Sequence, residues 1–254
     1  MHIAVCIKRV GTTDDDIEFT DDGRSVDPDY LDYGLNEWDA AAIAEALRLR
    51  DQAGAGRVVV VTAGDDDAEE VLVQGLAMGA DHAIRVDADP ERLADPLTVG
   101  RVLAAAVRPL GVDLVLCGAQ SADAAQGTTA GAVAGVLDLP CATVVTGIDR
   151  EPAGTTLVRR ELEGGVVDVI RISGPAVLSI QTGIAEPRYV TLRALQQAQQ
   201  QDIEVVDADL ADLGEPGYRI RHMVLPPAAR AEIVNGGAAA IAAKITELVR
   251  GAAK

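Results

Sequence analysis

Two nearly continuous apolar runs, HIAVCIK at residues 2–8 and VVVVT at residues 58–62, decide the fold class of this chain. Such runs are typical of strands that are buried on both faces, as in parallel sheets covered by helices. Between them, residues 37–53 place Ile43, Leu47 and several alanines on one face of a predicted helix, which ends before Gly54. This strand–helix–strand order predicts an α/β fold built on a parallel sheet.

The same alternation continues through the middle of the chain. Helices are predicted at residues 96–108, where Pro96 occupies the first turn, and after residues 65–67, whose three aspartates offer N-cap carboxylates. Further strands are predicted at residues 83–86, 113–117 and 144–145, and an Ala/Gly-rich helix at residues 128–137. We expect one Rossmann-like domain with helices on both faces of its sheet.

The pattern changes after residue 155. Residues 156–162 and 166–172 flank Glu163-Gly164-Gly165, which predicts a hairpin, and residues 176–181 add a strand to this antiparallel extension. From residue 192 the chain becomes polar, with glutamine-rich residues 196–201, and ends in an Ala-rich helix. We therefore predict an α/β domain at residues 1–191, which includes a loop at 184–192, and a polar linker with a helical arm at residues 192–254 that packs on a partner subunit.

Composition excludes several classes of protein. The formal net charge of −18 repels nucleic acid backbones and anionic membranes, and six aromatic side chains leave few platforms for stacking bases. No apolar stretch approaches membrane-spanning length, so we expect neither nucleic acid binding nor membrane insertion. Three widely spaced cysteines, Cys6, Cys117 and Cys141, fit buried thiols in a cytoplasmic protein.

The motifs of covalent, acid–base and metal catalysis are absent from the sequence. The three histidines, His2, His82 and His222, belong to no nucleophile–base array, and no zinc spacing, GxSxG elbow, Walker loop or GxGxxG motif occurs. We expect no catalytic residues and no metal site in this chain. If the protein takes part in redox chemistry, a cofactor must carry the electron.

The best candidate for a ligand site is the loop at residues 118–129, GAQSADAAQGTT. It follows a predicted parallel strand and leads into a helix, which is the edge of the sheet where open α/β folds bind nucleotides. Backbone N–H groups at the start of that helix, together with the hydroxyls of Thr128 and Thr129, can hold a phosphate. The same residues also fit an ordinary N-capped loop.

Several motifs occur in the order found in one known family. They are Ile7-Lys8-Arg9-Val10, Ala77-Met78-Gly79-Ala80-Asp81, Gly118-x-Gln120, Leu137-Asp138-x-Pro140, Val158-x-Arg160-x-x-Glu163-Gly164-Gly165, Asp168-x-Ile170, Pro175-x-Val177-Leu178-Ser179 and Glu186-Pro187-Arg188-Tyr189-Val190-Thr191-Leu192. Together they resemble the beta (small) subunit of electron-transferring flavoproteins over nearly the whole chain. Asp168 departs from the family's usual Glu or Gln. The resemblance implies an adenine nucleotide alpha-hydrolase-like fold.

The resemblance also implies a nucleotide pocket. In the family the loop at residues 118–129 and the ends of the first strands enclose AMP. Because Ala124 and Ala125 stand where many AMP-binding members have carboxylates, a second FAD, as in some electron-bifurcating members, is the alternative ligand. The implied cofactor-binding residues are Cys6, Asn36, Glu37, Trp38, Asp39, Ala63, Gly118, Gln120, Ser121, Asp123, Gln126, Gly127, Thr128 and Thr129.

The family role implied is that of an electron carrier. The chain would form a heterodimer with an alpha subunit that holds most of the redox FAD, and would pass electrons from flavin-dependent dehydrogenases, of the acyl-CoA type, to a quinone oxidoreductase. The implied docking residues are Glu161, Glu186, Arg188, Tyr189 and Leu192. From the sequence, Leu192 could instead pack within its own domain. A stand-alone nucleotide-binding sensor and a small-molecule hydrolase on the same fold are the rival interpretations.

Overall fold

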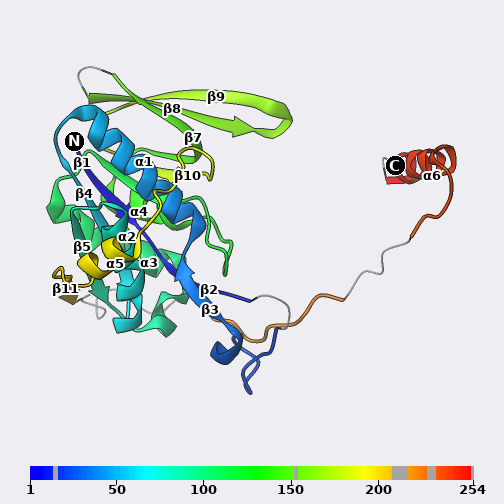
Figure 1. Ribbon diagram of the computed structural model, residues 1–254, viewed down its shortest axis with the longest axis horizontal. Helices are drawn as coiled ribbons and strands as arrows, with labels where there is room; N and C mark the ends of the chain where they lie inside the picture. The colour runs from blue at the N-terminus through cyan, green and yellow to red at the C-terminus, as the bar shows by residue number, and fades with distance from the viewer. Residues whose placement is uncertain (14–16, 152–153, 208–216, 228–232, 253–254) are drawn as a thin grey trace.

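A nine-stranded sheet forms the centre of the molecule (Figure 1). The computed structural model describes residues 1–13, 17–151, 154–207, 217–227 and 233–252. The strand order is β11-β5-β4-β1-β6-β10-β7-β8-β9. These strands are β1 (His2–Cys6), β4 (Arg57–Gly64), β5 (His82–Asp87), β6 (Leu114–Gly118), β7 (Cys141–Arg150), β8 (Thr155–Leu162), β9 (Val166–Ser173), β10 (Ala176–Ile180) and β11 (Glu204–Asp207). A separate antiparallel pair consists of β2 (Arg9–Thr12) and β3 (Asp32–Leu35).

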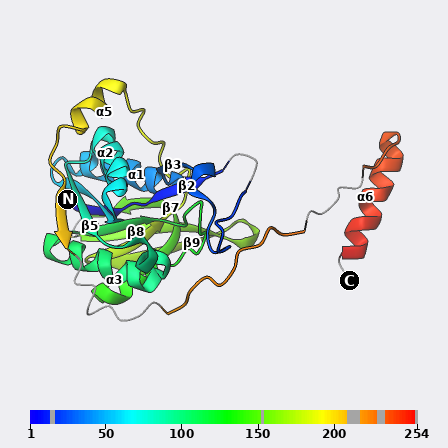
Figure 2. The same ribbon diagram turned by 90° about the horizontal axis from the view of Figure 1, so that it is seen from below.

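Helices cover both faces of the sheet, as Figure 2 shows. They are α1 (Glu37–Ala53), α2 (Glu69–Met78), α3 (Pro96–Val107), α4 (Thr129–Leu137), α5 (Leu192–Ala198) and α6 (Ala238–Ala252). Ile3 and Val5 of β1 pack in a core cluster with α1 and α2, whereas Ala4 and Cys6 pack in a second cluster with α3 and α4. Alternate side chains of a strand point to opposite faces, so apolar residues at every position bury both faces of β1. The predicted α/β fold is therefore confirmed.

The order of the strands reverses at β1. The chain runs from β1 through α1 to β4 on one side and then to β5, but β6 pairs with β1 on its other side. Both pairings are parallel, so the carboxyl ends of β1, β4 and β6 lie at one edge of the sheet. A reversal of this kind opens a crevice outside those strand ends, because the loops that follow them diverge.

The antiparallel extension is smaller than the sequence predicts. β8 and β9 form the predicted hairpin around Glu163–Gly165, and β8 also pairs antiparallel with β7. The prediction that residues 176–181 extend it was wrong, because β10 lies between β6 and β7 and is parallel to both. An apolar run does not specify its neighbours, and β10 is buried throughout as a central strand. β7 is longer than the two residues predicted for it. It pairs with β10 up to a bulge next to Val144 and beyond it pairs antiparallel with β8.

The aspartates at residues 65–67 do not cap α2, so that prediction was also wrong. The helix begins at Glu69, and its N-cap residue is Ala68, which offers no side-chain cap. Asp66 instead accepts a hydrogen bond from Arg85 Nη2 at 2.6 Å. The buried Arg85 also binds Glu69 and Asp87, so the local carboxylates neutralise this guanidinium.

The segment after residue 191 contributes to the sheet. β11 lies within the predicted polar linker, yet it pairs parallel with β5 at the sheet edge. The predicted terminal helix corresponds to α6, which lies apart from the α/β body in Figure 1 and exposes Ile245 and Leu248. Within the described ranges, no helix has the combination of length and apolar character that spanning a membrane requires.

Candidate functional site

A cavity of about 650 Å³ opens at the carboxyl ends of β1, β4 and β6, where the strand order reverses. Its volume lies in the range of small-molecule and cofactor sites. Ten of the fourteen predicted cofactor-binding residues line it: Cys6, Asn36, Asp39, Ala63, Gly118, Gln120, Ser121, Gln126, Gly127 and Thr129. The structure therefore brings together residues from four separate parts of the chain.

Asn36 and Asp39 hold the rim of this cavity in place from the start of α1. Asn36 is the N-cap residue of α1, but its side chain does not cap the helix. Its Nδ2 donates to the carbonyl oxygen of Gln120 at 2.8 Å, and its Oδ1 accepts from the backbone N–H of Ala122 at 3.2 Å. The buried amide thus fixes the loop that follows β6.

Asp39 joins the ends of β1 and β6. Its Oδ2 accepts from the backbone N–H of Lys8 at 2.8 Å, and its Oδ1 accepts from that of Gly118 at 3.0 Å. Burial raises the pKa of Asp39 to about 7, although both hydrogen bonds favour the ionised carboxylate. The carboxyl group thus sits on the cavity wall with a pKa near neutrality.

Two thiols line the cavity at the ends of β1 and β6. Cys6 and Cys117 are paired residues on the adjacent strands β1 and β6, and both are buried. The neighbouring Cys6 thiol and burial together hold the pKa of Cys117 well above its usual range. Buried thiols behave as small, polarisable apolar groups, which suits the flat apolar part of a ligand.

Two glycines permit the close approach of backbone segments at this edge. A Cβ on Gly118 would lie 2.3 Å from Asp39 Oδ1 and 2.8 Å from the Cβ of Trp38, so only glycine fits beneath the start of α1. Gly127 has a φ of 62°, a left-handed conformation that glycine adopts without strain. It directly precedes the N-cap residue Thr128 of α4, where backbone N–H groups point out of the helix.

The remaining four predicted residues lie outside the cavity lining. Trp38 donates from Nε1 to Gln181 Oε1 at 2.9 Å, and Glu37 occupies the first turn of α1. Asp123 forms an ion pair with Lys8, with Nζ 2.6 Å from Oδ2. Burial opposes ionisation of Asp123, but hydrogen bonds led by that from Lys8 outweigh it and lower the pKa. Thr128 makes no side-chain cap hydrogen bond.

Much of one cavity wall consists of residues that were not predicted from the sequence. Leu93, Val99 and Leu103 form an apolar surface contributed by α3 and the turn before it, and Lys8 and Arg9 add two cations. The apolar periodicity of residues 96–108 predicts a buried helix face, but not that part of this face borders a cavity. The lining combines this apolar wall and the backbone N–H groups at α4 with three carboxyl side chains, those of Asp39, Asp65 and Asp67. That arrangement can accommodate a planar apolar group joined to an anion.

The predicted docking segment, residues 184–192, lies on the surface beside α1. Leu192 is 72% exposed and Tyr189 is 91% exposed, so the alternative in which Leu192 packs within its own domain is wrong. Glu186 is exposed in the same segment, and Glu161 is exposed on β8.

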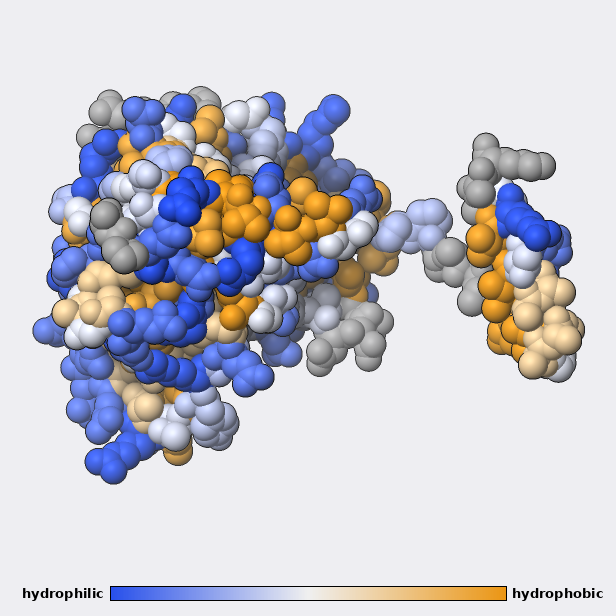
Figure 3. Space-filling model, turned by 90° about the horizontal axis from the view of Figure 1, so that it is seen from above, coloured by the Kyte–Doolittle hydropathy of each residue, from blue (hydrophilic) through white to orange (hydrophobic). Residues whose placement is uncertain are grey.

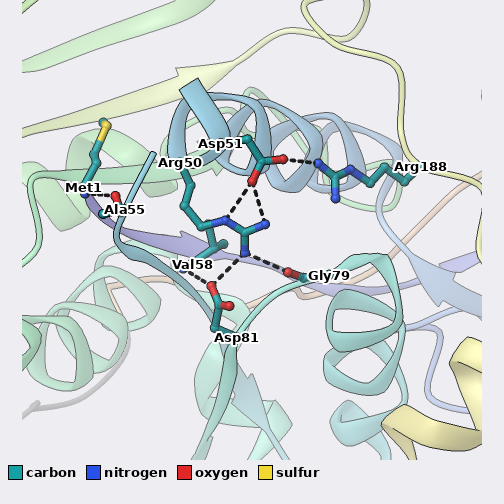
Figure 4. Close-up of polar contacts among 8 residues, drawn as sticks. All are labelled: Met1, Arg50, Asp51, Ala55, Val58, Gly79, Asp81 and Arg188. Carbon is teal, nitrogen blue, oxygen red and sulfur yellow. Dashed lines mark hydrogen bonds and ion pairs between the residues drawn. The ribbon is translucent and has the colours of Figure 1, made fainter. Parts of the chain in front are cut away.

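Arg188 anchors this segment to the body, as Figure 4 shows. Its Nη2 lies 2.6 Å from Oδ2 of Asp51 on α1, and Asp51 also binds Arg50. Arg50 in turn donates to Asp81 and to the carbonyl oxygen of Gly79. This chain of contacts holds the middle of the docking segment on the body, and the side chains of Tyr189 and Leu192 are exposed.

Comparison with known proteins gives consistent similarities. Residues 25–211 match the electron transfer flavoprotein domain family. The chain is 38% identical over 260 aligned residues to electron transfer flavoprotein subunit beta of Methylophilus methylotrophus, with 98% of each chain covered. It is 31% identical to the Bacillus subtilis (strain 168) protein of that name, over 100% of this chain and 99% of the relative. It is 35% identical to the human one, over 84% and 83% respectively.

Proposed function

The chain belongs to the family of electron transfer flavoprotein beta subunits, and on that premise we propose how it works. It pairs with an alpha subunit that holds the redox FAD, accepts electrons from flavin-dependent dehydrogenases of the acyl-CoA type, and delivers them to a quinone oxidoreductase. The beta chain contributes scaffold, docking surface and flavin environment, and catalyses no bond-making step alone. The observation that carries the proposal is the match over 98% of the chain.

The cavity at the strand reversal binds AMP as a structural nucleotide. Its apolar wall suits an adenine ring, while the backbone N–H groups at the N-terminus of α4 suit a phosphate. Asn36 and Asp39 hold this frame together through their hydrogen bonds to backbone groups of the strand ends and of the loop after β6. The described lining residues include no histidine that could serve as a general base, which favours a nucleotide-binding role over a hydrolase of the Ser–His or Cys–His type.

A second FAD in place of AMP is the alternative. Ala124 lines the cavity at a position where many AMP-binding members of the family carry a carboxylate. The missing charge lowers the repulsion that a pyrophosphate would meet there. Counting nucleotides in the purified heterodimer distinguishes the two hypotheses. AMP in the cavity gives one FAD with one AMP, whereas a second FAD in the cavity gives two FAD.

Two exposed apolar surfaces suit the alpha subunit. The β8–β9 hairpin exposes Val166, Val167 and Val169, and β9 lies at the edge of the sheet with one side unpaired. Figure 3, which views the molecule from the hairpin side, shows hydrophobic surface on this face. The second surface is the apolar side of α6 around Ile245 and Leu248. Contiguous exposed apolar residues of this kind mark interaction sites, and a sheet edge also offers unpaired backbone groups to a partner.

The dehydrogenase docks on residues 184–192. Leu192 inserts into an apolar pocket of that partner, and the Arg188–Asp51 ion pair restrains the segment that presents it. Glu161 on the exposed hairpin helps to steer the flavin-bearing domain of the alpha subunit. Tyr189, which is exposed on the same segment, belongs to the residue types that are enriched among interface hot spots.

Co-expression with the alpha subunit tests the nucleotide assignment. We expect a heterodimer that releases FAD and AMP in equal amounts on denaturation. Ala63→Phe places a ring in the cavity and should remove AMP while the alpha-bound FAD still reduces. Ala53→Phe, at the exposed end of α1 and outside the cavity, is the matched control and should retain AMP. Unchanged nucleotide content in Ala63→Phe would place the site elsewhere.

A further inference from the structure

Tyr218 bridges two parts of the cavity lining that lie far apart in the sequence. Its hydroxyl donates to the carbonyl oxygen of Ala94 at 2.6 Å and accepts from Nε2 of Gln126 at 2.5 Å. Ala94 precedes α3 and Gln126 belongs to the loop before α4, and both line the cavity. One hydroxyl therefore links, through a donor and an acceptor bond, the segments that lead into the neighbouring helices α3 and α4.

The segment that carries Tyr218 is attached on both sides of this bridge. At one end, the backbone N–H of Gly217 lies 3.5 Å from Oδ2 of Asp95, the N-cap residue of α3. At the other end, the N–H of Met223 donates to the carbonyl oxygen of Gly23 at 2.8 Å. The ring of His222 packs on Gly23, where an added Cβ would lie 2.6 Å from Nδ1. In Figure 2 this segment, in orange, leaves the body on the α3 side.

We infer that Tyr218 is a positioning residue that clasps the cavity mouth and sets how fast a nucleotide enters and leaves. The hydroxyl joins Ala94 to Gln126 through two hydrogen bonds, which are the side-chain part of the attachment of this segment. Tyr218 itself does not line the cavity, so it acts on the ligand through these two contacts. The inference rests on the proposed nucleotide site and adds a kinetic role to it.

A clasp and a binding contact have different kinetic signatures. Losing a binding contact speeds dissociation and weakens equilibrium affinity, whereas opening a clasp speeds association and dissociation together. Tyr218→Phe keeps the ring and removes both hydrogen bonds. Because a net hydrogen bond corresponds to a few-fold change in an equilibrium constant, we expect both rate constants to rise by roughly tenfold.

The experiment uses the full chain co-expressed with its alpha subunit and labelled AMP as the probe. Association is followed after mixing with the nucleotide-depleted heterodimer, and dissociation after a chase with unlabelled AMP. Tyr30→Phe is the matched control, because Tyr30 is half-exposed and outside the cavity lining. The melting temperature of each depleted heterodimer shows whether Tyr218→Phe remains folded, and Tyr218→Ala provides a second variant with the bridge removed.

The possible outcomes distinguish the kinetic role of Tyr218 from the existence of the AMP site. Parallel rises in both rate constants for the Tyr218 variants, with near-constant affinity, support the clasp. Unchanged rates refute it, and so does a faster dissociation with unchanged association, because that result makes Tyr218 an indirect binding contact. If the unaltered heterodimer takes up no AMP, the AMP assignment fails, and the clasp on AMP exchange fails with it.

Discussion

Asp39→Asn should change how the stability of the protein depends on pH. The Asp39 carboxylate is buried and accepts two backbone hydrogen bonds, one to each oxygen, from Lys8 and Gly118. Asparagine keeps one acceptor and places an NH₂ group against the other N–H. A buried donor left without its partner costs about 1–3 kcal/mol of folding free energy. The variant also removes the titration of this group, which has a separate and calculable effect.

The sign of that effect follows from the raised pKa. Burial raises the pKa of Asp39 from 3.8 to about 7. At a pH between these two pKa values, Asp39 is ionised in the unfolded chain and protonated in the folded chain. Rising pH therefore favours unfolding. From pH 5 to pH 7, which is two pH units, the free energy of unfolding falls by about 3 kcal/mol. Above pH 7 the folded chain also loses the proton, and the free energy of unfolding falls no further through this group. The Asn variant lacks this term, so its stability relative to wild type should rise by about 3 kcal/mol from pH 5 to pH 8.

Urea unfolding of the heterodimer at pH 5 and pH 8, followed by far-UV circular dichroism at one protein concentration, measures the difference. Asp22→Asn is the control, because hydrogen bonding from Thr20 lowers the pKa of Asp22 and keeps it ionised across this range. The control should show a constant difference from wild type. If Asp39→Asn also differs from wild type by the same amount at both pH values, the carboxyl group does not titrate near neutrality and the reasoning about its burial is refuted.

Three further predictions concern other parts of the molecule. Leu192→Ala should weaken dehydrogenase docking by about 2 kcal/mol. It should leave the melting temperature nearly unchanged, because the side chain is 72% exposed. A large fall in melting temperature with normal dehydrogenase-linked flavin reduction would contradict the docking role. In thermal unfolding, Gly118→Ala should destabilise the fold by several kcal/mol, because the added Cβ would clash with Asp39. Gly131→Ala on α4 is the control, because the space around Gly131 is open, and it should be neutral or stabilise by up to about 1 kcal/mol. Expressed without the alpha subunit, the chain should aggregate; a monodisperse monomer that unfolds cooperatively would count against an obligate interface.

Local signals predicted the elements whose ends depend on nearby residues. α1 spans Glu37–Ala53 as predicted, because Gly54 adopts the left-handed conformation that ends it. The β8–β9 hairpin likewise follows from the Glu163–Gly165 turn between two strand-forming segments. In both cases the information lies within a few residues of the boundary, so the sequence pattern is sufficient.

Long-range pairing was not predictable from such patterns. The parallel position of β10 depends on β6 and β7, which precede it in the chain by tens of residues, and nothing in its apolar run names these neighbours. β11 was missed for a related reason, since an edge strand with exposed side chains has no distinctive hydrophobic pattern. The contact between Tyr218 and Gln126 likewise joins residues 92 positions apart.

The site itself shows why a buried carboxylate occurs where it costs stability. The pairing of β1 with β6 ends at Cys6 and Cys117, because the two strands lead into diverging connections. Beyond that point the N–H groups of Lys8 and Gly118 bind Asp39 instead of a strand. Two unpaired buried amides would together cost about as much as burying the carboxylate that satisfies both. The divergence that opens the cavity thus creates the unpaired amides, and the raised pKa of Asp39 is a consequence of holding that opening in place.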